Sequence, residues 1–149
     1  MKRFLFRIFV IIPILIFSAS PFSVSQASAL ETGNLFGIHL MTVTLKPGVR
    51  MEQFQGFFVA KVLPEYEKQW PEIKGYLLKS FSPKSKNSFA VVWLFKSVAA
   101  RNKYFTPGGK ANALELKARE GVKPIEAELK AKFGSYTVKY TDEDDWVVQ

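Results

Sequence analysis

The 149-residue sequence contains no cysteine and only one histidine, His39. Without cysteine there is no disulfide, no thiol nucleophile, no Cys-ligated metal and no cysteine for lipid attachment. A single histidine leaves no histidine pair for a metal ion and no recognisable Ser/His/Asp set. The sequence also lacks a glycine-rich phosphate-binding loop. We therefore expect stability to come from packing, and we expect neither a metal site nor a cofactor.

The first 29 residues have the composition of a secretory signal peptide. Basic residues up to Arg7 precede an apolar core over Ile8–Phe17, and Ala27-Ser28-Ala29 has the small-x-small form of a cleavage site. Ten apolar residues are too few to span a hydrocarbon core of ~30 Å, so an uncleaved membrane anchor is the weaker alternative. We expect export to a periplasm or the medium, and a mature chain of residues 30–149 with no stable membrane span.

Residues 30–149 suit a single domain. Their 18 lysines and arginines exceed the 13 aspartates and glutamates by five, which favours solubility and weak attraction to anionic surfaces. Export argues against a nucleic-acid partner. Near the end, Asp142-Glu-Asp-Asp145 lacks the spacing and the glycine of a calcium loop, so it is expected to be a solvated acidic tail.

The stretch Phe89–Phe95 is an unbroken apolar run rich in β-branched and aromatic residues. A strand with one wet face would alternate apolar and polar residues, so this run predicts a central strand that is covered on both faces. Helices can cover one face. The chain has few elements left for the other, which predicts a dimer or an enclosed pocket.

The other elements follow from periodicity and from helix and turn signals. We expect strands over 36–46, 75–81 and 136–140, an amphipathic helix from Met51 to about Leu63 that Pro64 kinks or restarts, and helices over 98–105, over 110–120 up to Gly121, and from Pro124 to Gly134. Strand, helix, strand, strand, helical region and strand is the order of the ferredoxin-like α+β fold, an antiparallel sheet with helices on one face.

Alternate residues of the first strand point to opposite faces of the sheet, with Ile38, Leu40, Thr42 and Thr44 on one face. His39, Met41 and Val43 share the other face, and we expect this face to point away from the first helix. A bare apolar sheet face would be a large exposed patch, which soluble monomers rarely tolerate. Two sheets closing face to face would bury it, so we expect a homodimer with the architecture of a dimeric α+β barrel.

Three stretches resemble the dimeric α+β barrel proteins, the grouping that holds the Dabb domain, the antibiotic-biosynthesis monooxygenases and the NIPSNAP-like proteins. Gly37-Ile-His-Leu-Met-Thr-Val-Thr-Leu-Lys-Pro-Gly48 is similar to the His-bearing first strand and Lys-Pro-Gly turn of Dabb-type domains. The other two are similar to the end of the first helix and to a strand-to-helix junction in the other branches: Val62-Leu-Pro-Glu-Tyr66 with Pro71 and Gly75, and Trp93-Leu-Phe-Lys-Ser-Val-Ala-Ala100 with Tyr104-Phe105. The resemblance implies the fold and the dimer.

The chain also departs from these relatives. Haem-degrading and cyclase relatives use a histidine in the helical half of the domain. The present chain has Thr106-Pro-Gly-Gly109 where Dabb-type chains often place a histidine-containing loop. Haem ligation in the family manner and cyclase chemistry are therefore not expected.

The candidate ligand-binding residues are His39, Met41, Val91, Trp93 and Tyr104. His39 is the side chain that titrates nearest neutrality, so it could act as a base or orient a ligand. It could equally be a buried polar residue bonded to a backbone carbonyl or a tyrosine. The apolar and aromatic candidates could line a cavity for a hydrophobic ligand, or belong to an ordinary core.

Three functions remain open from the sequence. The first is a dimer that binds a small hydrophobic or aromatic molecule, which the mostly apolar inventory favours. The second is a cofactor-independent monooxygenase-like or isomerase-like enzyme in which His39 and a tyrosine do acid–base work. The third is a structural dimer without a ligand. A polar cluster around His39 would favour the second.

Overall fold

The computed structural model describes residues 30–81, 88–140 and 145–149. The predicted signal peptide and most of the acidic run lie outside these residues. The elements are β1 Leu35–Leu45, α1 Met51–Phe57, the π-helical turn η1 Phe58–Val62, α2 Leu63–Gln69, β2 Ile73–Lys79, β3 Phe89–Phe95, α3 Val98–Asn102, α4 Ala113–Lys132, β4 Gly134–Val138 and β5 Asp145–Val147. None of the helices described is long and apolar enough to cross a membrane.

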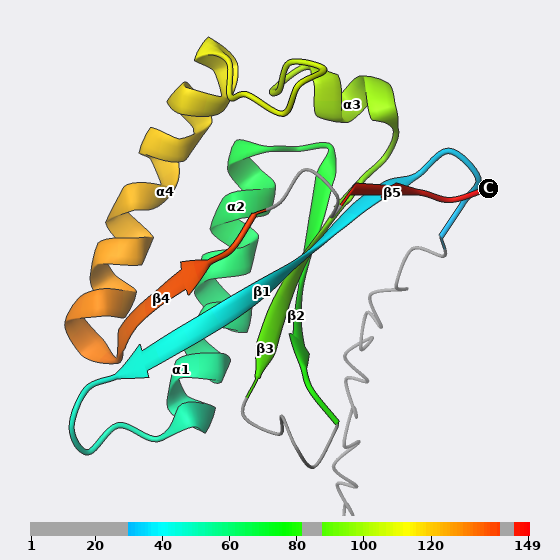
Figure 1. The fold of residues 1–149 in the computed structure, drawn as a ribbon. Coiled ribbons are helices and arrows are strands. Elements are labelled where there is room, and N and C mark those ends of the chain that lie inside the picture. The colour runs from blue at the N-terminus through cyan, green and yellow to red at the C-terminus, as the bar shows by residue number, and fades with distance from the viewer. Residues whose placement is uncertain (1–29, 82–87, 141–144) are drawn as a thin grey trace, which may run out of the picture.

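The strands form one antiparallel sheet in the order β2-β3-β1-β4, with β5 paired to the first part of β1. Helices α1, α2 and α4 lie on one side of it (Figure 1). This order and this layering confirm the predicted ferredoxin-like α+β fold.

Strand β3 lies between β1 and β2, as its unbroken apolar sequence predicts. Six of its seven residues are buried, and only Val92 is partly exposed. On the helix side of the sheet, Val91 packs into a core with Phe54 and Phe58 of the first helical segment. Burial of these large side chains is the main stabilising contribution that fixes the helices on this face.

The prediction that His39 and Met41 point away from the helices is wrong. Met41 belongs to the same core as Phe54, and His39 lies on the same face of β1. The face left open carries Leu40, which is 66% exposed, and Ile38. Alternation along β1 could not decide the orientation because both faces are apolar.

The first helical segment runs from α1 through η1 to α2 without a break in helical backbone. At the end of η1 the N–H of Leu63 bonds to the carbonyl of Phe58, five residues back. The wide turn directly precedes Pro64, which has no N–H to donate to Ala60. The sequence predicts an irregularity here, and the structure shows it to be a π turn and not a break.

Helix α4 corrects the prediction of two helices separated at Gly121. It is one helix over Ala113–Lys132, with Pro124 inside. Pro124 and Lys123 are exposed, so the proline ring meets solvent on the outer side of the helix. On the inner side of the helix, Val122 and Leu129 are buried in the core. Their burial stabilises the helical conformation on both sides of Pro124.

The structure adds one strand that the sequence analysis missed. Residues 145–147 form β5, which pairs with Leu35–Gly37 at the start of β1. Asp145, the last residue of the acidic run, is therefore part of the sheet and not of a solvated tail.

Candidate functional site

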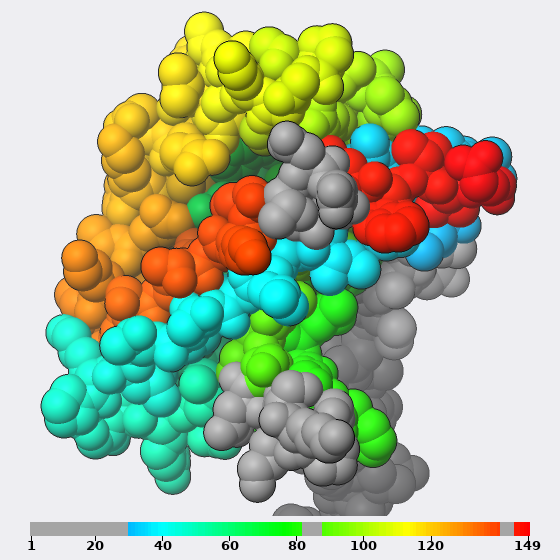
Figure 2. Space-filling model, in the orientation of Figure 1, coloured from blue at the N-terminus to red at the C-terminus, as the bar shows by residue number. Residues whose placement is uncertain are grey.

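A cavity of about 330 Å³ lies between the helix side of the sheet and the helices α2 and α4. Its volume is at the lower end of the range for small-molecule sites. Figure 2 shows the surface hollowed between α4 and β4. The residues that line it come from segments far apart in the chain: His39, Tyr66, Trp70, Ile73, Trp93, Phe95, Arg101, Phe105, Gly109, Ala111, Glu115, Arg119, Tyr140 and Asp145.

One wall of the cavity is a stack of three aromatic rings. The Tyr66 ring lies between Trp70, with centroids 5.3 Å apart, and Trp93, with centroids 4.9 Å apart; the interplanar angles are 12° and 24°. Tyr66 and Trp70 share a side of α2 because they are four residues apart. A Cβ on Gly75, opposite Trp93 on β2, would lie 2.7 Å from the Trp93 ring. The glycine therefore makes room for the ring that completes the stack.

An ion pair between a buried glutamate and an exposed arginine borders the aromatic wall. Glu115 is 1% exposed, and its Oε1 accepts hydrogen bonds from Nε and Nη2 of Arg119 at 2.9 and 2.5 Å. Asn112 caps α4 by accepting from the N–H groups of Leu114 and Glu115, which places Glu115 in the first turn, facing inward. Burial acts to lower the pKa of Arg119, but the hydrogen bond and the charge of Glu115 outweigh it, and the pKa is raised.

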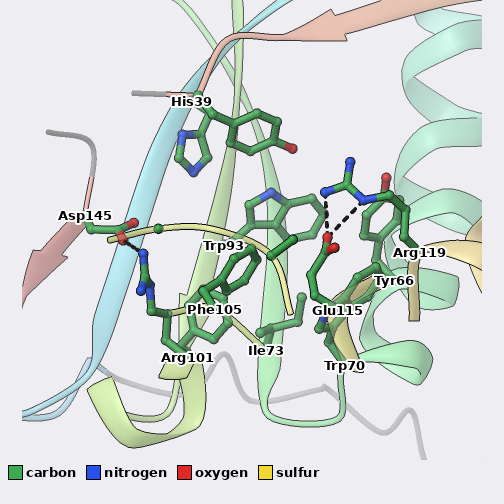
Figure 3. A pocket seen from close by; sticks show the side chains of 14 residues that line it. His39, Tyr66, Trp70, Ile73, Trp93, Arg101, Phe105, Glu115, Arg119 and Asp145 are labelled. Atoms are coloured by element: carbon green, nitrogen blue, oxygen red, sulfur yellow. Dashed lines mark hydrogen bonds and ion pairs between the residues drawn. The ribbon is translucent and has the colours of Figure 1, made fainter. Parts of the chain in front are cut away.

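A second ion pair lies on the opposite side of the cavity. Arg101 of α3 contacts Asp145 of β5 at 3.1 Å, and its side chain is only 15% exposed. The guanidinium lies over the Phe105 ring, 5.2 Å from the centroid, in a cation–π contact. Figure 3 shows both ion pairs facing the space between the aromatic rings.

His39 lies on the β1 side of the cavity and is 6% exposed. Its ring packs on Tyr140, with centroids 4.5 Å apart. His39 Nε2 and Asp145 Oδ1 both lie within 3.0 Å of the point that a Cβ on Gly37 would occupy. The missing side chain of Gly37 thus lets an imidazole and a carboxylate approach the same place. Polar groups do gather around His39, the condition that favours acid–base chemistry.

Two phenols share one carboxylate beside the cavity. Oε1 of Glu126 accepts from the hydroxyls of Tyr66 at 2.5 Å and of Tyr136 at 2.8 Å. Burial is the largest cause that raises the pKa of each phenol, so both stay protonated hydrogen-bond donors at physiological pH. This cluster lines an adjoining cavity of about 320 Å³, which shares Tyr66, Arg119 and Tyr140 with the first.

Of the five predicted ligand-binding residues, His39 and Trp93 line the cavity. Met41 and Val91 lie in the core beneath it, and Tyr104 packs behind Trp70, with ring centroids 6.5 Å apart. The indole N–H of Trp93 is a buried donor, and it hydrogen-bonds with Tyr140.

The sequence analysis missed most of the polar lining: Arg101, Glu115, Arg119 and Asp145. Glu115 and Arg119 are four residues apart, a spacing that is just as typical of a surface pair on a helix. Among the described residues, no three histidine, aspartate or glutamate side chains gather as a metal site would require.

No protein-family model and no curated protein matches the chain. Solved structures with a similar backbone include the following two. One is a mutant of SnoaB, a cofactor-independent oxygenase from Streptomyces nogalater, with 16% identity, a TM-score of 0.40 and coverage of 74% of this chain and 94% of that one. The other is a dimeric protein of unknown function and ferredoxin-like fold from Bacteroides fragilis, with 13% identity, a TM-score of 0.34 and coverage of 77% and 96%. Likenesses this distant say nothing about the activity of the present chain.

Proposed function

We propose that this protein binds a small, flat, mostly apolar molecule in the cavity between α2, α4 and the sheet. The observation that carries the proposal is the stack of Trp70, Tyr66 and Trp93 along one wall of an open cavity of about 330 Å³. Parallel rings offer a planar molecule a continuous stacking surface. The two ion pairs at the sides supply the few polar groups that orient a ligand in such sites.

The test is a titration of the purified protein with indole and, separately, with 2-naphthol, in which calorimetry measures the binding. We expect saturable binding of one molecule per chain. Ala111 lines the cavity and is exposed, so Ala111→Phe should fill the cavity from its rim and lower the affinity by at least about tenfold, which is 1.4 kcal/mol.

The matched control is Ala113→Phe, because Ala113 is exposed two residues further on and does not line the cavity. The control should bind as the unmutated protein does. Absence of saturable binding to the unmutated protein, or equal affinities for all three proteins, would contradict the proposal.

The grouping of His39, Tyr140 and Asp145 at one end of the cavity supports a second candidate function, a cofactor-independent monooxygenase-like or isomerase-like enzyme. Such an enzyme would use His39 as a base beside a ligand stacked on the aromatic wall. The two candidates differ in what leaves the protein. Mass spectrometry of the ligand recovered after incubation in air should show it unchanged for a binder and altered for an enzyme.

We further propose that the chain is a member of the dimeric α+β barrel grouping and forms a homodimer through the open sheet face. The support is the apolar character of that face. Ile38 of β1 is opposite Val92 of β3, and Leu40 is opposite Ala90, so these side chains form a continuous patch across the central strands. Covering it with a second sheet would remove apolar surface from water.

A further inference from the structure

Glu115 has a carboxylate oxygen without a partner. Both contacts from Arg119 go to Oε1, whereas Oε2 is buried and has no hydrogen-bond partner within residues 30–81, 88–140 and 145–149. An arginine normally engages both oxygens of a carboxylate in a forked pair. A buried acceptor left without a hydrogen bond destabilises the folded state by roughly 1–3 kcal/mol, and by more when it belongs to a charged group. The arrangement therefore lacks one hydrogen-bond donor.

The charges around the cavity show which kind of donor is missing. Arg119 already neutralises Glu115, and Arg101 neutralises Asp145, so the charged groups of the lining are paired. The remaining titratable side chains that line the cavity are His39, Tyr66 and Tyr140. A cation bound at Glu115 would lie beside the Arg119 guanidinium and be repelled by it. A neutral N–H or O–H donor meets the requirement of Oε2 without that repulsion.

The position of Glu115 connects this donor to the aromatic wall. Figure 3 shows the carboxylate directed toward the middle of the cavity, between Trp93 and Arg119. A partial turn of the carboxylate about its last side-chain bond, a torsion with broad minima, would expose Oε2 to the cavity. Arg119 can follow Oε1 through this turn because its side chain is 55% exposed. A molecule stacked on the Trp93 and Tyr66 rings would present its edge, and not its face, to this oxygen.

We propose that Glu115 is a specificity-determining residue whose second oxygen accepts a hydrogen bond from a neutral N–H or O–H on the edge of the bound aromatic molecule. This proposal rests on the binding function proposed above and adds the chemical class of the ligand. It predicts that the cavity prefers donor-bearing rings over isosteric rings without a donor, because an unbound Oε2 would stay unsatisfied beneath the latter.

The experiment compares indole with benzothiophene, which has nearly the same shape and no donor, by calorimetry on the purified protein. We expect indole to bind about 10- to 100-fold more tightly, the range that a hydrogen bond to a charged group contributes. Binding of both with equal affinity would overturn the proposal for Glu115 and leave the binding function intact. Binding of neither would overturn the binding function and this proposal together.

The variant Glu115→Gln adds a second test. The guanidinium of Arg119 can only donate, so the glutamine oxygen should face Arg119 and the NH₂ group should replace Oε2. A donor would then meet the indole N–H, and the preference for indole over benzothiophene should disappear. Quinoline, whose ring nitrogen accepts, should gain affinity for this variant.

The control is Glu128→Gln on the same helix. Glu128 pairs with Lys132 at 2.6 Å with the same spacing of four residues, but at the surface and outside both cavities. The control should keep the full preference for indole. A preference that survives in Glu115→Gln, in protein that melts as a folded domain, would contradict the assignment.

Discussion

At the scale of single residues, the cavity depends on two glycines and one histidine. A side chain at Gly75 would collide with Trp93, and one at Gly37 with His39, so both aromatic rings need a bare backbone beside them. His39 is buried among Tyr140 and Asp145, yet it lines the cavity. Its role follows from what it exchanges with a ligand: a hydrogen bond in a binder, a proton in an enzyme.

The variant His39→Gln separates these roles. Glutamine keeps one donor and one acceptor but cannot shuttle protons near neutrality. We expect the variant to keep its melting temperature and most of its affinity for indole. If His39 were a general base, binding would survive while conversion of a bound substrate fell by about 10²–10⁴-fold. Turnover in an extract of the producing cells that is lost in the variant would decide for the enzyme.

At the scale of elements, proline has different effects in the two long helical segments. Pro64 follows a π turn in which the backbone has adapted to the missing N–H. Pro124 lies within α4, where helix packing overrides it. A proline that began a second helix would occupy a favourable position, whereas one in a helix interior costs about 3 kcal/mol relative to alanine.

The variant Pro124→Ala therefore has an effect whose sign depends on the continuity of α4. We expect it to raise the free energy of unfolding in urea by about 1–3 kcal/mol, because alanine restores an N–H to the helix and removes the ring, while the unfolded chain gains some entropy. Lys117→Ala, an exposed change on the same helix, should have little effect. A loss of stability in Pro124→Ala would indicate two helices.

At the scale of the whole molecule, the sheet has one face covered by helices and one apolar face without cover from the described helices. The run Phe89–Phe95 is apolar on both sides, and the helices account for one of them. The other side joins Ile38 and Leu40 in the patch that we propose as the dimer interface.

The variant Leu40→Lys tests this dimer. Leu40 is 66% exposed, so a lysine there is tolerated in a monomer but would bury an unpaired charge in a sheet-to-sheet interface. We expect light scattering to show a dimer for the unmutated protein and a folded monomer for the variant. Val98→Lys, at a 41% exposed apolar residue of α3 off the sheet, should remain dimeric. A monomeric unmutated protein at high concentration would exclude the interface.

The element order and the centrality of β3 were predictable because local patterns encode them. The unbroken apolar run Phe89–Phe95 can be read directly from the order of the residues. The spacing of four between Phe54 and Phe58 places both on one side of the expected first helix. The candidate site was predictable only in part. His39 and Trp93 stand out by residue type, whereas Glu115 looks like any helical carboxylate four residues before an arginine.

The sequence by itself determined the fold class, the absence of thiol chemistry and the expectation of an exported chain, which stays a prediction. Only the tertiary structure decided which face of β1 meets the helices, because both faces are apolar. It alone brought together Tyr66, Trp93, Glu115 and Arg101 from four elements around one cavity. Their convergence depends on how helices pack across a sheet, and no local sequence pattern records that geometry.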